Sequence, residues 1–211
     1  MLHIKVPATS ANMGPGFDCA GIALQLYNEI WVETIPSGIE ISSKTNENIP
    51  KDESNLIYST IRDFYEAENI PMPGIRLIQD DHIPMTRGLG SSAACIVGGL
   101  IAANILSGKN YSKEELAQKA AKLEGHPDNS NPAIFGDMII SAMYSEGMKY
   151  VKLNVERYGG MICSPWFDRP LSVAGRIIVN ENDEFVTKLV NVDRDLLMLP
   201  NLAIHMNREA N

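Results

Sequence analysis

Residues 84–94, PMTRGLGSSAA, place two glycines, Gly88 and Gly90, and two small hydroxyl residues, Ser91 and Ser92, directly before a long apolar segment. Glycine lets a backbone turn tightly and expose successive N–H groups. A helix that begins here adds unpaired N–H donors and the positive end of its dipole. The combination predicts a cradle for phosphate groups. The alternative is a plain turn before a core helix, and neither a Gly-Lys-Ser/Thr P-loop nor a G-x-G-x-x-G dinucleotide loop is present.

Strands and helices must position that loop. Alternation of apolar and polar residues predicts strands over residues 1–8, 21–35 and 74–84, with a turn-rich loop over 9–18. Helices are predicted over 52–68 behind an acidic first turn, over 93–106, and over 111–125, where Ser112 and Glu115 match a capping box. Residues 125–144 predict a loop, a short helix and a strand. This order of elements favours an α/β or α+β fold.

Composition narrows the class of protein. The net charge of −8 over 211 residues, without a basic cluster, argues against a nucleic-acid partner or an anionic membrane. The apolar run at 93–106 is too short to cross a bilayer, and the N-terminus lacks the pattern of a signal peptide. Three widely separated cysteines, Cys19, Cys95 and Cys163, fit a reduced compartment. We therefore expect a cytoplasmic protein.

Three motifs resemble those of one enzyme family. Pro84 with residues 88–94 resembles the second motif of the GHMP small-molecule kinases. VPATSANMGPGFDCAGIAL (6–24) and EGHPDNSNPAIFGDMIIS (124–141) resemble the first and third landmarks of its homoserine kinase branch. The resemblance implies an α+β fold in which residues 1–150 form a GHMP-kinase N-terminal, ATP-binding domain, a mixed sheet with helices on one face. It also implies Mg²⁺-dependent phosphate transfer from ATP to the hydroxyl of L-homoserine, a step of threonine biosynthesis.

The same resemblance assigns the nucleotide and metal residues. ATP would lie on the glycine loop, and magnesium would be held by hard oxygen ligands, Glu124 and a loop serine, Ser92 or its neighbour Ser91. Local sequence alone explains Glu124 equally well as a solvated residue at a helix C-terminus. The implied cofactor-binding residues are Pro84, Arg87, Gly88, Leu89, Gly90, Ser91, Ser92 and Ala93, with Asn55 on the adenine side.

Substrate and catalytic residues follow from the first and third motifs. Asn12 and Asp18 are the implied substrate contacts, with Asp18 suited to an ammonium group, although Asn and Asp also favour such loops for their turn chemistry. His126 and Asn129 are implied near the reacting hydroxyl, while a capping or packing role is the alternative for His126. No Ser-His-Asp arrangement or lysine base is evident. Phosphoryl transfer tolerates this because positioning and charge neutralisation supply most of the acceleration.

The C-terminal part has a different character. Residues 151–211 are predicted to be a β-rich segment, with strands over 171–180 and 184–192 and a helix start near the end. The words YGG, WFDRPLSVAGR and PNLAIHMNR resemble part of the aspartyl aminopeptidase family of metallopeptidases, so the chain has the features of a hybrid joined within 147–156. His205 resembles a family histidine of the substrate pocket of an adjoining subunit, although a packing or surface histidine is favoured.

The sequence is compatible with three functions. The first is a homoserine kinase whose second domain is absent. The second is a non-catalytic nucleotide-binding or interaction module, and the third is an aminopeptidase fragment. The absent domain would leave an apolar face uncovered, so we expect marginal stability or homo-oligomers.

Overall fold

The computed structural model describes residues 1–14, 16–45, 48–155, 170–181 and 184–198. Contacts divide the chain into two compact units, Met1–Glu156 and Arg157–Asn211, which are described separately. His205, Cys163 and the helix start expected near the C-terminus lie outside the described residues.

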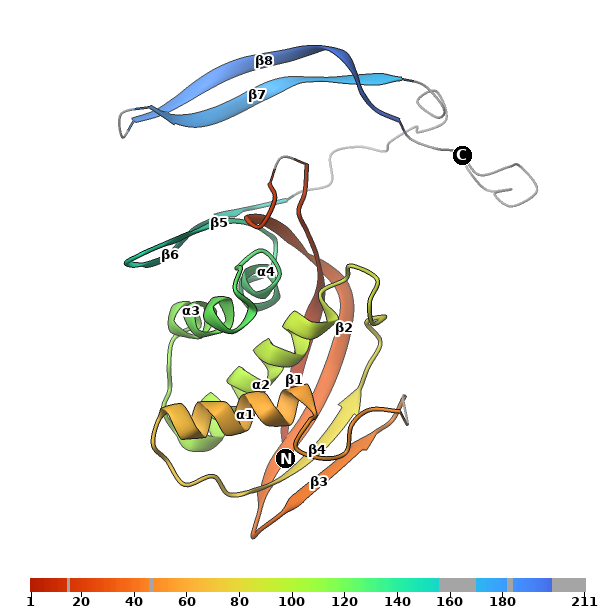
Figure 1. Cartoon of the computed structure of the whole chain (residues 1–211), viewed down its shortest axis with the longest axis vertical. Helices are drawn as coiled ribbons and strands as arrows, with labels where there is room; N and C mark the ends of the chain where they lie inside the picture. Colours follow the sequence, from red (N-terminus) through yellow and green to blue (C-terminus); the bar gives the residue numbers. More distant parts are fainter. Residues whose placement is uncertain (15, 46–47, 156–169, 182–183, 199–211) are drawn as a thin grey trace, which may run out of the picture. The chain divides into compact units, whose positions relative to one another are not determined.

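A single long strand, β2 (Ala20–Ile35), organises the sheet of the N-terminal unit (Figure 1). Strand β1 (Leu2–Ala11) pairs with it antiparallel along one edge. On the other edge, residues 29–35 of β2 pair with β4 (Gly74–Asp80), and residues 20–22 pair with β5 (Met138–Tyr144). Strand β3 (Ile39–Ser43) joins β4 in parallel, and β6 (Gly147–Leu153) joins β5 antiparallel. The sheet is therefore mixed.

Helices of this unit lie together over one face of the sheet (Figure 1). They are α1 (Leu56–Ala67), α2 (Ser91–Ser107), α3 (Lys113–Glu124) and α4 (Ser130–Phe135). Apolar side chains from both layers form one core, among them Val6, Ile30 and Leu77 from the sheet and Ile61 and Val97 from the helices. This confirms the predicted α+β class, a mixed sheet with helices on one face.

Helix α2 packs between the sheet and α1. Apolar side chains on all its sides allow it to be buried there. A Cβ atom at Gly98 would collide with the side chain of Ile30, and one at Gly99 would lie 2.8 Å from Cβ of Thr60 in α1. The two consecutive glycines thus let the helix approach both neighbours closely. This packing fixes where the N-terminus of α2 lies.

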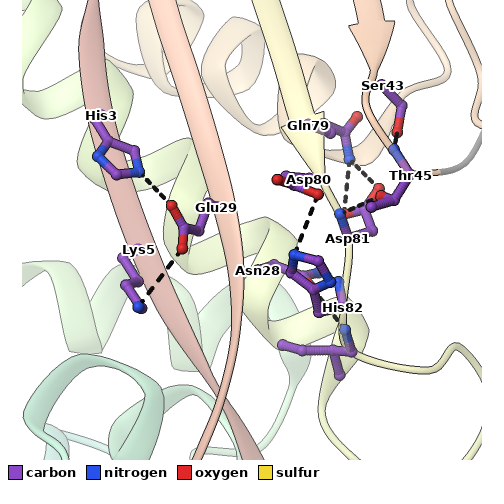
Figure 2. Close-up of polar contacts among 11 residues, drawn as sticks. His3, Lys5, Asn28, Glu29, Ser43, Thr45, Gln79, Asp80, Asp81 and His82 are labelled. Carbon is purple, nitrogen blue, oxygen red and sulfur yellow. Dashed lines mark hydrogen bonds and ion pairs between the residues drawn. The ribbon is translucent and has the colours of Figure 1, made fainter.

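The structure has two strands that the sequence did not predict, β3 and β6, and β1 continues to Ala11, into the loop expected over 9–18. Two further differences in element boundaries have an identifiable cause. Helix α1 begins at Leu56, not at residue 52, because the side chain of Asn55 accepts hydrogen bonds from the N–H groups of Ile57 and Tyr58 and caps it. The acidic residues 52–53 precede the helix, so the expected acidic first turn is wrong. Strand β4 ends at Asp80 instead of continuing to residue 84, because Asn28 Oδ1 accepts hydrogen bonds from the backbone N–H groups of His82 and Ile83, 2.8 Å each (Figure 2). Those two donors are therefore withdrawn from the sheet.

The second unit contains an antiparallel hairpin within the described residues. Its strands are β7 (Leu171–Glu181) and β8 (Glu184–Leu197), which agrees with the expected β-rich character. Large apolar side chains such as Ile178 and Leu189 are exposed on it. A two-stranded hairpin has too little core to be stable alone in water. Within the described ranges, no helix has both the length and the apolarity needed to cross a membrane.

Candidate active site

The glycine loop, residues 84–90, leads directly into α2 and contains two backbone conformations that favour glycine. Gly88 and Gly90 have left-handed φ angles of 68° and 64°. Gly90 is the N-cap residue of α2, and no side chain caps this end of the helix. The N–H groups of Ser91, Ser92 and Ala93 have no partner within the helix, because the first intrahelical bond runs from Ala94 N to Gly90 O. The end of α2 is therefore an anion-binding end.

This helix end opens into a cavity of about 500 Å³. Its walls come from the glycine loop, from the first turns of α2, and from the end of α3 with the segment after it, residues 125–129. Eleven residues assigned from sequence line it: Pro84, Arg87, Gly88, Leu89, Gly90, Ser91, Ser92, Ala93, Glu124, His126 and Asn129. The structure thus brings the predicted phosphate, metal and catalytic residues to one place.

Glu124 ends helix α3 at the wall of this cavity. Its Oε2 atom is buried and makes no hydrogen bond, so the alternative of a solvated helix-end residue does not describe it. Burial raises the pKa of Glu124 to about 7; the charge of Asp128 adds to the shift and His126 opposes it. A divalent cation would compensate this unpaired oxygen, so the residues present fit magnesium bound by Glu124 and a loop serine. Within the described part of the chain, no three His, Cys, Asp or Glu residues form a protein-only metal cage.

His126 is held by a buried acid rather than by packing alone. Its Nδ1 lies 2.5 Å from Oδ1 of Asp128, whose side chain is fully buried and whose Oδ2 has no partner. Gly21 in β2 makes room for this segment, because a Cβ atom there would overlap the carbonyl oxygen of Asp128. The imidazole is thereby fixed at the wall of the cavity.

The loop between β1 and β2 carries the two predicted substrate contacts. Asn12 and Asp18 both have left-handed φ angles, 57° and 54°, and Asn12 Oδ1 accepts a 2.9 Å hydrogen bond from the backbone N–H of Asp18. This is the turn chemistry that was the alternative for Asn12. Neither residue lines the 500 Å³ cavity. The charge of Asp18 nevertheless contributes, after that of Asp128 and Glu124, to raising the pKa of His126.

Asn55 lines a second cavity, of about 260 Å³, next to the first. The two cavities share Pro84 and Ser91. Asn55 is buried, and besides capping α1 its amide nitrogen donates to Gln79 Oε1 at 2.6 Å. Gln79 in turn donates to the carboxylate of Asp81, and Thr45 accepts from the N–H of Asp81 (Figure 2). Asn55 is therefore a structural residue at the edge of a site that a nucleotide base could enter.

Sequence reasoning did not select three residues that shape the site: Thr9, Gly21 and Asp128. All three lie inside the motifs quoted for the family resemblance. Asp128 could have been noticed as an acid two residues from a histidine. Thr9 and Gly21 gave no local signal, because their importance depends on contacts with residues more than 80 positions away.

Comparison with known proteins agrees with this geometry. The profile "GHMP kinases N terminal domain" matches residues 55–137. Homoserine kinase of Caldicellulosiruptor saccharolyticus is 43% identical over 93% of this chain and 64% of its own length, and that of Petrotoga mobilis is 46% identical over 74% and 51%. The N-terminal unit is a GHMP kinase N-terminal domain. The chain spans just under two thirds of the length of the first of these relatives and about half that of the second.

Solved structures show the same fold for the GHMP kinase domain. The homoserine kinase of Cytophaga hutchinsonii is 30% identical, with a TM-score of 0.61 over 73% of this chain and 52% of its own. A Listeria monocytogenes protein is 41% identical, with a TM-score of 0.65 over 72% and 54%. The mevalonate kinase of Methanococcus jannaschii, at 17% identity and a TM-score of 0.57, covers 74% of this chain and 56% of its own and shares the fold.

A second profile, "Aminopeptidase I zinc metalloprotease (M18)", matches residues 139–211, which agrees with the expected second resemblance. This match begins inside β5, within the sheet of the GHMP kinase domain. The alignment with the Caldicellulosiruptor enzyme covers 93% of this chain and so extends into the same residues. The two similarities therefore overlap, and the junction expected within 147–156 stays a prediction.

Proposed function

We propose that the chain is the nucleotide-binding half of a cytoplasmic homoserine kinase, an enzyme that transfers the γ-phosphate of ATP to the hydroxyl of L-homoserine for threonine biosynthesis. One observation carries the proposal: the uncapped start of α2 and the residues Glu124, His126 and Asn129 line the same cavity, and Glu124 has an unpaired carboxylate oxygen. Donors for a triphosphate and a ligand for its metal thus face a common space. The small-molecule substrate is supported by the homoserine kinases that the chain resembles.

Each group has a role that its chemistry supports. The N–H groups of Ser91, Ser92 and Ala93 would bind phosphate oxygens, and Glu124 with Ser92 would hold Mg²⁺, which neutralises charge on the transferring phosphate. The base of the nucleotide would enter the neighbouring 260 Å³ cavity, which Asn55 lines and which shares Pro84 and Ser91 with the phosphate site.

The substrate side lies toward Asp18 and His126. The Asp18 carboxylate suits the ammonium group of homoserine, and Asn12 shapes the turn that presents it. Asn129 would donate to the reacting hydroxyl or to the phosphate. The hydroxyl then attacks without a strong side-chain base, because positioning and charge neutralisation provide most of the acceleration. We place the boundary of this domain near residue 150.

Calorimetric titration with Mg-ATP, with and without homoserine, tests the proposal. We expect the wild type to bind Mg-ATP, Ser92→Tyr to lose that binding because the ring would fill the start of α2, and an assay for ADP release to depend on homoserine. Absence of any Mg-ATP binding by the wild type would overturn the proposal.

A non-catalytic nucleotide-binding module is the second candidate, because the uncapped start of α2 offers donors to phosphate groups whether or not a substrate is turned over. Binding of Mg-ATP without homoserine-dependent ADP release would select it. An aminopeptidase fragment has only the profile match at 139–211 in its favour. Release of acidic residues from the N-terminus of a peptide would support that function.

A further inference from the structure

Thr9 lies at the point where strand β1, the glycine loop and the segment after α3 meet. It is fully buried in β1, and its backbone N–H donates to the carbonyl of Leu89 at 3.1 Å. Its hydroxyl donates to Oδ1 of Asn129 at 2.8 Å. One residue thus connects to the phosphate loop through its backbone and to the predicted catalytic amide through its side chain.

Asn129 occupies a helix N-cap position without using its side chain as a cap. Asparagine is among the favoured N-cap residues because its side-chain oxygen accepts from the first helical N–H groups. At the start of α4, Asn129 makes no such bond. Instead, the Oδ1 atom of Asn129 accepts a hydrogen bond from Thr9, and its Nδ2 atom lies 3.5 Å from Oδ1 of Asp128. The side chain therefore bonds to neighbours at the wall of the cavity and does not cap the helix that it starts.

Two neighbours together decide which way this amide faces. A hydroxyl can donate or accept, so Thr9 alone would tolerate either orientation. In the flipped orientation the carbonyl oxygen of Asn129 would face the carboxylate of Asp128, and two acceptors would repel each other. Asp128 thus favours the NH₂ group on its side, and Thr9 then donates to the oxygen. His126 Nδ1 contacts the same oxygen of Asp128, Oδ1.

Gly90 leaves the room for this arrangement. A Cβ atom there would overlap the Thr9 hydroxyl and lie 3.0 Å from Asn129 Oδ1. The end of the phosphate loop therefore passes directly over the hydrogen bond between Thr9 and Asn129.

We propose that Thr9 is a positioning residue of the active site. Its hydroxyl donates a hydrogen bond to the side-chain oxygen of Asn129, so that the NH₂ group of that amide is available as a hydrogen-bond donor to the phosphate or hydroxyl bound in the cavity. The proposal rests on the proposed function in one respect: it assumes that the bound ligands are a phosphoryl donor and its acceptor. The orientation of the amide is a property of the ligand-free chain and is measurable without turnover.

The test compares Thr9→Val, which removes the hydroxyl and keeps the branched shape, with Thr9→Ser, which keeps the hydroxyl. Thr34→Val, at an exposed threonine of β2, is the matched control. In ¹⁵N-labelled full-length chain, the side-chain amide signals of Asn129 are assigned by their loss in Asn129→Asp. We expect them to be distinct in the wild type, in Thr9→Ser and in Thr34→Val, and to move when Mg-ATP with homoserine is added. In Thr9→Val they shift or broaden and lose that response.

Turnover provides the second measurement. We expect Thr9→Val to lower kcat about 10- to 100-fold with a much smaller change in KM for ATP, because a positioned donor is lost while the phosphate cradle remains. Thr9→Ser should retain kcat within about threefold. Should Thr9→Val fail to fold, Thr9→Ala removes the same hydroxyl without overpacking the site.

The outcomes separate the two proposals. Unchanged Asn129 amide signals in the variants that lack the hydroxyl would overturn the role of Thr9, whatever the activity. A wild type that transfers no phosphate would count against the kinase, while the amide signals would still decide the role of Thr9. If the wild type is active and Thr9→Val has the same kcat, the positioning role would also be overturned.

Discussion

His126 Nδ1 lies 2.5 Å from Oδ1 of Asp128, and the two side chains differ sharply in exposure: 43% for the imidazole and none for the carboxylate. Burial of the imidazole favours its neutral form, but the hydrogen bond and charge of Asp128, helped by Glu124 and Asp18, outweigh this and raise the pKa of His126. The positively charged form of His126 is therefore favoured close to where a phosphate would be bound.

Replacing that carboxylate should lower the pKa of His126. In Asp128→Asn the favourable charge is lost while the burial of the imidazole remains. An NMR titration of the His126 ring protons in the two proteins measures the change. Because the pKa of the folded state is raised, the stabilisation from this pair is complete below the ordinary histidine pKa and disappears as pH rises through the raised value. A titration curve unchanged by Asp128→Asn would contradict this account.

Glu124 should make both stability and metal binding depend on pH in a predictable direction. Its pKa is raised from 4.5 to about 7, so the folded state loses stability as pH rises between those values. At pH 8, Glu124→Gln should therefore be more stable than the wild type, by at most about 3 kcal/mol, with little difference at pH 4. Urea unfolding at the two pH values measures this, and Glu66→Gln, an exposed residue of α1, is the control.

Metal dependence gives the second signature of Glu124. Since a carboxylate must lose its proton to bind Mg²⁺, affinity for Mg-ATP should fall as pH drops below about 7 in the wild type. Glu124→Gln should bind ATP weakly and without dependence on Mg²⁺. Retained Mg²⁺ dependence in this variant would remove Glu124 from the metal site.

Gly88 and Gly90 form a matched pair for testing the glycine loop. Both have left-handed φ angles, so alanine at either position should cost about 1–2 kcal/mol of stability. A Cβ atom at Gly88 has no heavy atom within 4 Å, whereas one at Gly90 collides with the Thr9 hydroxyl. We expect Gly90→Ala to be less stable than Gly88→Ala by roughly a further 1–3 kcal/mol and to lose Mg-ATP binding. Equal stability and binding in the two variants would contradict the close approach.

A polar cluster remote from the cavity should stabilise the fold over a defined pH range. Glu68 accepts hydrogen bonds from Lys119 at 2.8 Å and from Tyr111 at 2.7 Å, and it pairs with Lys109 at 3.0 Å. These partners, led by Lys119, lower the pKa of Glu68 to about 2. The resulting stability is present above pH 4.5 and is lost as pH falls toward 2. Glu68→Gln should destabilise the chain by about 1–2 kcal/mol at pH 7 and very little at pH 2, with Mg-ATP binding unchanged.

Self-association is expected through the outer face of β5 and β6. Ile140 and Val151 are directly opposite each other in the sheet, and with Tyr144 and Leu153 they form an exposed apolar surface on the face that α3 and α4 do not cover. Such a surface favours association. Sedimentation of the wild type should show oligomers, and the double variant Ile140→Lys/Val151→Lys should shift the chain toward monomer. A monomeric wild type with a sharp, cooperative melt would contradict this expectation.

The sequence predicted the parts of the fold that local patterns determine. Alternation located β1, β2 and β4 but not β3 and β6, and the capping box at Ser112 and Glu115 is present in the structure. The start of α1 was missed because Asn55 rather than the acids before it makes the capping bonds. The glycine loop and Glu124 could be placed together only through the family resemblance. Thr9 and Gly21 could not be identified, because each acts through a contact made when strands β1 and β2 meet the segment after α3.

Strand β2 supports both sides of the site. At one end Gly21 admits the backbone of Asp128, and seven residues further along Asn28 binds the chain at His82 and Ile83. Because β2 runs through both attachments as one strand, at most roughly 23 Å of extended backbone separates them. Between them the pairing of β2 with β1 shifts register near Ala8, an irregularity of the kind that bends a strand and increases its twist. The distance between the acid-bearing segment and the wall of the smaller cavity is thus set by one bent strand, and any change in that bend would move both walls together.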